Sequence, residues 1–182
     1  MTTMPSTRGA SLFIPEEDYG FYSLSALATI IFCERGLPFL YQGQEIGMSN
    51  RQWKYDEFND LETINQYQIA LKAGMSKEQA LEIARHHSRD NARTPMQWSS
   101  EDNAGFSKGK PWMPVNENYK VVNVAEEEKE YGSILNFYKR LIAFYKSEEY
   151  NEILTYGDFR PIYEKEDHIF AYSRSYGCQK LV

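Results

Sequence analysis

Three observations along the 182-residue chain predict an α/β fold that continues into a β unit. An almost uniformly apolar helix over residues 23–35 is followed at once by a short apolar run with the character of a strand buried on both faces. An amphipathic helix follows over residues 133–146. Beyond it the sequence alternates as β-strands do. We therefore expect an α/β unit over residues 1–147 and the beginning of a β domain over residues 148–182.

The first helix and the strand after it carry the prediction of a parallel sheet. Seven residues of the helix are apolar on nearly all sides, and Gly36 stands where a C-terminal cap belongs. Residues 37–41 are then continuously apolar, and Pro38 is tolerated near the start of a strand. A polar, glycine-rich stretch at residues 42–48 follows at the carboxyl end of this strand, which is where α/β folds place their sites.

The remaining elements follow from periodicity and from turn residues. Two helices are expected after the strand, one over residues 62–73 and one opened by Ser76, with Gln79 completing a capping box. Residues 86–123 lose all periodicity and are rich in Pro and Gly, which predicts a long ordered loop. Near the C-terminus we expect strands over residues 159–163 and 168–175 around the charged turn 164–167, and a third strand that begins at Leu181.

Composition excludes several classes of function. The net charge is -6 and the basic residues form no cluster, so no nucleic-acid partner is expected. No apolar stretch is long enough for a membrane span and no secretory signal is present, so the expectation is a cytoplasmic protein without a membrane partner. Cys33 and Cys178 are isolated and His86-His87 lacks further ligands at suitable spacing, so neither a disulfide, a metal nor a cofactor is expected.

Two groups of motifs add a specific resemblance. The first reads GLPFLYQGQEIGM at residues 36–48, and the second reads SRDNARTPMQW at residues 88–98. The second continues as NAGF, KPW and VNENY within residues 103–119. In this order they resemble the eighth barrel strand and the following loop of family 13 α-glucosidases, the oligo-1,6-glucosidase, dextran glucosidase and trehalose-6-phosphate hydrolase group. The resemblance implies the C-terminal part of a (β/α)8 TIM barrel, followed by the start of a C-terminal all-β sandwich.

The same resemblance implies retaining hydrolysis of α-glucosidic bonds, α-1,6 or α-1,4, in oligosaccharides. In that chemistry one carboxylate attacks the anomeric carbon and a second, about 5 Å away, protonates the leaving oxygen. The family carries these groups on earlier strands, and its third catalytic Asp belongs to an Asn-His-Asp-x-Pro-Arg motif. If Arg8 is aligned with the Arg of that motif, Met4 and Pro5 fall where His and Asp are needed. No catalytic residue is therefore expected in this chain.

The resemblance implies that these 182 residues can still contribute contacts to the substrate. Arg89 matches an Arg that holds the non-reducing glucose, and a guanidinium fork suits paired hydroxyls or a carboxylate. Glu62 matches a residue of the second glucose subsite. The alternative, which is equally favoured, is an exposed Glu in the first turn of a helix with no role in binding. Arg93 is a further candidate, for which an ion pair that holds the loop is the alternative. Gln44 and Glu45 are the last candidates, with a bracing hydrogen bond as their alternative.

Two functions from different classes remain open. The first is the hydrolytic activity of a longer α-glucosidase of which this chain is the C-terminal fragment. The second is a non-catalytic module that binds saccharide or pairs with an N-terminal barrel fragment. Partial barrels leave unpaired sheet edges, and such edges require a partner.

Overall fold

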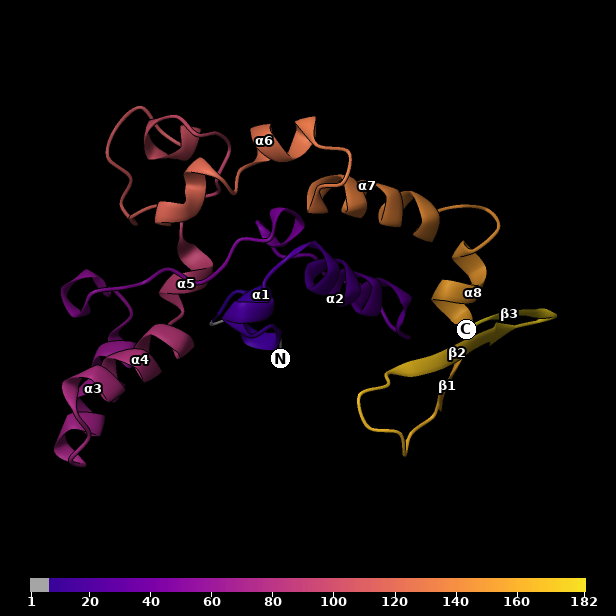
Figure 1. Cartoon of the computed structure of the whole chain (residues 1–182), viewed down its shortest axis with the longest axis horizontal. Helices are drawn as coiled ribbons and strands as arrows, with labels where there is room; N and C mark the ends of the chain where they lie inside the picture. Colours follow the sequence, from indigo (N-terminus) through magenta and orange to yellow (C-terminus); the bar gives the residue numbers. More distant parts are fainter. Residues whose placement is uncertain (1–6) are drawn as a thin grey trace.

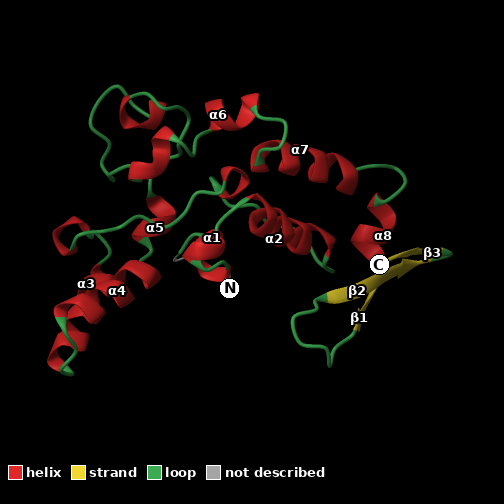
Figure 2. Cartoon of the chain, viewed as in Figure 1, coloured by secondary structure: helices red, strands yellow, loops and turns green. Residues whose placement is uncertain are grey.

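The computed structural model describes residues 7–182, which form a helix-rich chain with a small antiparallel sheet at its C-terminal end (Figure 1). Figure 2 shows that helices and loops make up nearly all of the rest. Met4 and Pro5 lie outside the described residues. The elements in chain order are α1 (Gly9–Phe13), η1 (Glu16–Asp18), α2 (Phe21–Cys33), η2 (Gln44–Ile46), η3 (Tyr55–Glu57), α3 (Leu61–Lys72), α4 (Lys77–His87), α5 (Asp90–Arg93), η4 (Asp102–Gly105), η5 (Glu117–Lys120), α6 (Val124–Lys129), α7 (Ile134–Tyr145), α8 (Asn151–Tyr156), β1 (Asp158–Ile162), β2 (Ala171–Tyr176) and β3 (Gln179–Leu181).

The helices α2 and α7 pack against each other and form the core of the central part of the chain (Figure 1). Ala28 and Phe32 of α2 are buried against Ile134, Tyr138 and Leu141 of α7. This contact confirms the amphipathic helix predicted over residues 133–146, because its apolar stripe is the buried face. The Ser133 side chain accepts a hydrogen bond from Asn136 N and so caps the helix.

The predicted buried strand over residues 37–41 is wrong for the described part of the chain. These residues belong to no helix and no sheet, and Leu37 and Phe39 are 73% and 75% exposed. A strand needs a neighbour to receive its backbone hydrogen bonds. No strand within residues 7–182 lies beside this segment. The predicted glycine cap is also wrong, because α2 ends at Cys33 with an extended Glu34, whereas Gly36 has a φ of 147°.

The helices α3 and α4 form an antiparallel pair at the opposite end of the molecule from the sheet (Figure 1). Both helices were predicted, as was the capping box at the start of α4. Ser76 Oγ accepts a hydrogen bond from Gln79 N, and Gln79 Oε1 accepts one from Ser76 N. Their shared core includes the fully buried Trp53 from the preceding segment.

The loop between α4 and α7 is ordered by buried polar side chains, as its Pro and Gly content predicted. Gln97 and Asn123 are completely buried, and Gln97 Nε2 donates to Asn118 Oδ1 at 3.1 Å and to the Val122 carbonyl. Short helical turns interrupt the loop at η4, η5 and α6. The buried side chains supply hydrogen bonds that regular secondary structure would otherwise supply to the backbone.

The C-terminal sheet has the order β1-β2-β3 with antiparallel neighbours throughout. Asp158 is opposite Ser175 and Ile162 is opposite Ala171, so β1 and β2 form a hairpin around the predicted charged turn. The third strand begins at Gln179, earlier than the predicted Leu181. The helix α8 was not predicted, because six residues are too few to establish a helical period.

Candidate functional site

The site is built around Arg89, which lies between α4 and α5 and faces the start of α3. Its Nε and Nη2 donate to Asp60 Oδ1 at 3.1 and 2.6 Å, and Nη2 lies 3.4 Å from Glu62 Oε2. The side chain of Asp60 is 4% exposed, whereas that of Arg89 is 41% exposed. The guanidinium is thus fixed from one side by a buried carboxylate and remains open to solvent.

The charge of Asp60 is stabilised by its partners. Burial acts to raise the pKa of Asp60, but the hydrogen bonds from Arg89 and Thr63 outweigh it, so this pKa is lowered. The same hydrogen bond raises the pKa of Arg89. Thr63 Oγ1 lies 2.8 Å from Asp60 Oδ2 and 3.1 Å from Ser88 Oγ, which ties α3 to the residue before Arg89. Both groups are therefore charged at neutral pH.

A second carboxylate, Asp90, holds the backbone of this site. Its side chain is completely buried, and its Oδ2 accepts hydrogen bonds from the backbone N–H groups of Asn59 and Asp60 at 2.7 and 2.9 Å. Its Oδ1 pairs with Arg93 Nη1 at 3.3 Å. Arg93 therefore makes the loop-holding ion pair that was the alternative to substrate contact.

The structure brings only some of the predicted residues together. Arg89 and Glu62 form an ion pair, and Arg93 joins them through Asp90. Gln44 and Glu45 belong to η2, which packs against α7, and Glu45 shares a hollow with Tyr138 of that helix. Gln44 Oε1 accepts a hydrogen bond from Tyr41 N at 3.4 Å, the bracing interaction that was its alternative.

The buried Arg8 links Gln42, directly after the apolar segment 37–41, to Asn91 of α5. Its Nε donates to the Asn91 carbonyl at 3.0 Å, its Nη2 donates to Thr94 Oγ1 at 2.9 Å, and its Nη1 donates to the Gln42 carbonyl. Its guanidinium also lies over the ring of Tyr41, at 5.7 Å. Arg8 therefore has a structural role in the described residues.

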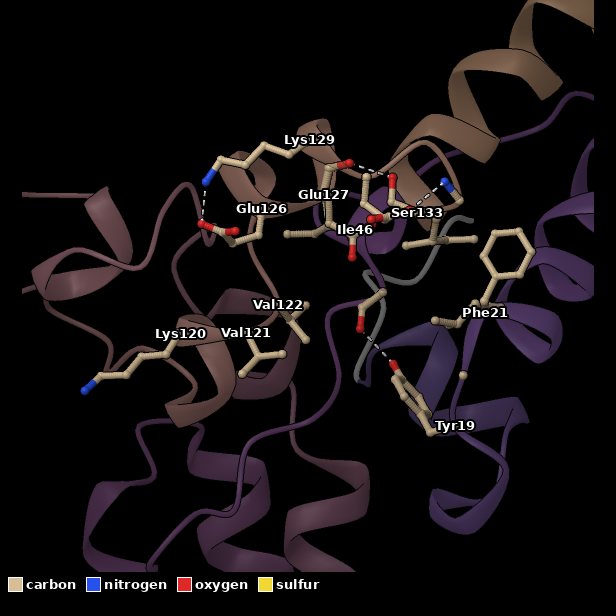
Figure 3. A pocket seen from close by; sticks show the side chains of 16 residues that line it. Tyr19, Phe21, Ile46, Lys120, Val121, Val122, Glu126, Glu127, Lys129 and Ser133 are labelled. Atoms are coloured by element: carbon tan, nitrogen blue, oxygen red, sulfur yellow. Dashed lines mark hydrogen bonds and ion pairs between the residues drawn. The ribbon is translucent and has the colours of Figure 1, made fainter.

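A hollow of about 700 Å³ lies elsewhere, between the start of α2 and the segment from η5 to α7 (Figure 3). Its walls carry Phe21, Ile46 and Val122, and its carboxylates have partners. Glu126 Oε1 is paired with Lys129 at 2.8 Å. Because these groups are already paired, the hollow offers no activated acid or base.

Neither a membrane helix nor a metal cluster is found in the part of the chain that the structure describes. Across residues 7–182, no helix combines the length and the apolar character needed to cross a bilayer. Nor do three metal-binding side chains gather anywhere within those residues.

Comparison with known proteins identifies the family. The sequence model of a family described as "Alpha amylase, catalytic domain" matches residues 6–157. The chain belongs to this alpha-amylase family. It is 41% identical over 177 residues to an oligo-1,6-glucosidase of Bacillus cereus, a match that covers 96% of this chain and 31% of that protein. It is 38% identical over 176 residues to a glucan 1,6-alpha-glucosidase of Streptococcus pneumoniae, which covers 96% and 32% of the two chains.

Solved structures of similar proteins match this chain over almost its whole length. The chain superposes on the crystal structure of trehalose-6-phosphate hydrolase from Bacillus licheniformis with a TM-score of 0.90 at 37% identity. This match covers 99% of the present chain and 32% of that structure. The predicted TIM-barrel class is therefore confirmed. The chain spans about a third of the length of the relatives it matches.

Within this alpha-amylase domain, sequence reasoning missed the two buried carboxylates that organise the site. Asp60 directly precedes α3 and has the appearance of an ordinary N-cap, yet its side chain makes no capping hydrogen bond. Asp90 was noted only as part of a motif. For Asp90 the available signal was its position three residues before Arg93, a spacing at which side chains on a helix meet. No local signal links Asp60 to Arg89, which is 29 positions away.

Proposed function

We propose that this chain forms the C-terminal part of the catalytic unit of a retaining α-glucosidase that acts on α-linked glucose oligosaccharides. Arg89 contacts the non-reducing glucose of the substrate and Glu62 contacts the next one. The nucleophile and the proton donor belong to the rest of the barrel, outside these 182 residues. The names of the relatives, oligo-1,6-glucosidase and glucan 1,6-alpha-glucosidase, support α-1,6 links as the first substrates to test.

The geometry of Arg89 carries the proposal. An arginine with only a structural role is normally buried and fully bonded, as Arg8 is. Arg89 instead is fixed on one side by two hydrogen bonds to Asp60 and is 41% exposed on the other. Arg93 is similarly exposed, at 37%, but has a single contact of 3.3 Å with Asp90, so its guanidinium is less firmly oriented. A guanidinium that is oriented in advance loses little entropy when it binds sugar hydroxyls, which favours recognition.

A barrel partner is part of the same proposal. The exposed apolar residues 37–41 have the sequence of a strand buried on both faces, and they lack a neighbour among the described residues. We propose that the remaining barrel strands pair with this segment, whether they belong to the same polypeptide or to a second one. The second candidate function, a non-catalytic module that binds saccharide or completes a barrel, rests on the same segment.

Complementation tests the proposal directly. The 182-residue chain would be produced alone and together with the N-terminal two-thirds of the Bacillus cereus oligo-1,6-glucosidase, and glucose release from isomaltose would be measured. We expect no release by the chain alone and clear release by the pair. Arg89→Lys should lower the activity of the pair, whereas Arg93→Lys should lower it less, because Arg93 pairs with Asp90.

Two results would count against hydrolysis. If the assembled pair is inactive but still binds isomaltose, the non-catalytic alternative is favoured. If Arg89→Lys leaves the activity of an active pair unchanged, Arg89 does not contact the substrate.

A further inference from the structure

We propose that a hollow beside the Arg89–Asp60 pair, lined by Trp112, Tyr119 and Asn59, binds a further glucose unit of a longer oligosaccharide. This unit would lie beyond the two that Arg89 and Glu62 contact. The inference rests on the proposed function, because it extends the same substrate. It assigns to the chain a preference for substrates longer than a disaccharide.

The hollow has the size and the lining of a saccharide site. Its volume is about 490 Å³, and its walls include two aromatic residues and three prolines or aliphatic residues. The side chain of Trp112 is 76% exposed although its neighbour Met113 is buried in the core of the α3–α4 pair. The neighbouring Met113 anchors the backbone, and the flat face of the exposed indole suits the C–H face of a pyranose.

Polar groups around the indole are available for sugar hydroxyls. Asn59 donates through Nδ2 to the Glu57 carbonyl and to Met113 Sδ, which leaves its Oδ1 open. Within residues 7–182 the side chains of Lys110, Trp112 and Tyr119 also line the hollow and have no hydrogen-bonded protein partner. They include an acceptor and several donors, which is what recognition of a hydroxylated ring requires. Glu57, in contrast, is fully used by two hydrogen bonds from Arg51, at 2.7 and 3.0 Å.

The hollow and the Arg89 site use consecutive residues of the chain. Asn59 contributes to its lining, and the next residue, Asp60, holds Arg89. Both backbone N–H groups of this pair donate to Asp90 Oδ2, so the two residues are held by one buried carboxylate. Because consecutive Cα atoms are about 3.8 Å apart, the hollow begins next to the residue that orients the guanidinium.

Hydrogen bonds and prolines brace the walls of the hollow without a ligand. Asn59 Nδ2 donates to the Glu57 carbonyl at 3.2 Å, and Asn103 Nδ2 donates to the carbonyls of Ser107 and Gly109 at 3.1 and 3.2 Å. Pro111 and Pro114 flank the indole and restrict the backbone on either side. A preformed wall avoids the cost of ordering a loop on binding.

The three tryptophans of the chain provide the test. Their indole N–H signals in a ¹⁵N–¹H spectrum report on Trp53, which is buried, on Trp98, which is 51% exposed outside the hollow, and on Trp112. The ¹⁵N-labelled 182-residue chain would be titrated with isomaltotriose and, separately, with methyl α-glucoside. We expect isomaltotriose to shift the Trp112 signal and to leave that of Trp98 in place.

Substitutions separate this inference from the proposed function. Trp112→Ala should weaken the affinity for isomaltotriose about five- to tenfold and leave that for methyl α-glucoside unchanged. Trp112→Phe should retain most of the binding, and Trp98→Ala is the matched control. Arg89→Lys should weaken binding of both ligands.

Two outcomes would overturn the inference and are distinguishable. If Arg89→Lys weakens the binding of both ligands but Trp112→Ala changes the binding of neither, the proposed further subsite is wrong and the proposed role of Arg89 stands. If Arg89→Lys changes the affinity for neither ligand, the proposed function itself is wrong. The hollow then has no argument for lying along the bound oligosaccharide.

Discussion

At the scale of single residues, the arginines differ in their hydrogen-bond acceptors and in their exposure to solvent. Arg8 and Arg174 are 3% and 1% exposed and donate to backbone carbonyls, and burial lowers the pKa of each. Arg89 is open to solvent, and its hydrogen bond to Asp60 raises its pKa. The first two therefore serve the fold, whereas Arg89 has donors left for a ligand.

Asp60→Asn tests the support of Arg89. We expect it to reduce the free energy of unfolding by about 1–3 kcal/mol at neutral pH, because it removes the charge from a buried, hydrogen-bonded acceptor. Glu62→Gln is the matched control, since the side chain of Glu62 is 63% exposed and meets the same guanidinium. Denaturant unfolding of both variants measures the difference, and equal losses would show that the burial of Asp60 is unimportant.

The lowered pKa of Asp60 adds a dependence on pH. A carboxyl whose pKa is lower in the folded state stabilises the protein fully above its unfolded pKa of about 3.9, and this contribution is lost as the pH falls through the folded pKa. The stability difference between the parent chain and Asp60→Asn should thus be constant from about pH 5 to 7 and shrink below about pH 4. A difference that grows on acidification would contradict the assignment.

At the scale of elements, one buried side chain joins the sheet to the helices. Arg174 of β2 donates to the carbonyls of Cys33 and Glu34 at the end of α2, at 2.8 and 2.9 Å. It also donates to the carbonyls of Leu154 and Gly157 at the end of α8, at 2.9 and 3.0 Å. The last carbonyls of a helix lack intrahelical partners and carry the negative end of its dipole, so a cation is well placed there.

Arg174→Met should therefore separate the sheet from the helices. The variant leaves several buried carbonyls without donors, and we expect a loss of about 2–4 kcal/mol in the free energy of unfolding. Arg160→Met on the neighbouring strand is the control, because Arg160 is exposed. Hydrogen exchange should also accelerate in β1 and β2 of the first variant only, and unchanged exchange there would exclude the linking role.

At the scale of the whole molecule, the proposed assembly rests on one exposed apolar segment, residues 37–41. Leu37 and Phe39 are exposed in this segment, which lies at the end of the helix α2. Isolated exposed apolar residues are normal, whereas a continuous apolar segment whose sequence favours a buried strand is consistent with the proposed pairing to another strand. The chain covers 31% of the Bacillus cereus relative, so the proposed neighbours correspond to the other part of that protein.

Phe39→Ser should affect assembly and leave the isolated chain intact. The side chain is 75% exposed, so its replacement should change the free energy of unfolding of the 182-residue chain by less than about 0.5 kcal/mol. Glucose release by the complemented pair should in contrast fall strongly. Val121→Ser, at an equally exposed position away from the segment, is the control and should change neither quantity. Equal effects of the two variants on assembly would contradict the pairing role.

The sequence by itself determined the family and the longer helices, and it proposed candidate site residues. Local signals sufficed for α7, whose apolar stripe has a helical period, and for α4, whose capping residues are three positions apart. The family resemblance proposed Arg89 and Glu62 as substrate contacts; the structure pairs their side chains, and their contact with substrate stays a prediction. These properties depend on neighbours in sequence, and such neighbours are visible without a fold.

Only the tertiary structure decided which polar groups meet. Arg89 and Asp60 are 29 positions apart, and Arg174 reaches a carbonyl 141 positions away, distances over which no periodicity extends. The error at residues 37–41 has the same origin, because an apolar run specifies the tendency to pair but not the presence of a neighbouring strand. Burial and hydrogen-bond partners are properties of the assembled chain, and they separate a structural arginine from one that is free to bind a ligand.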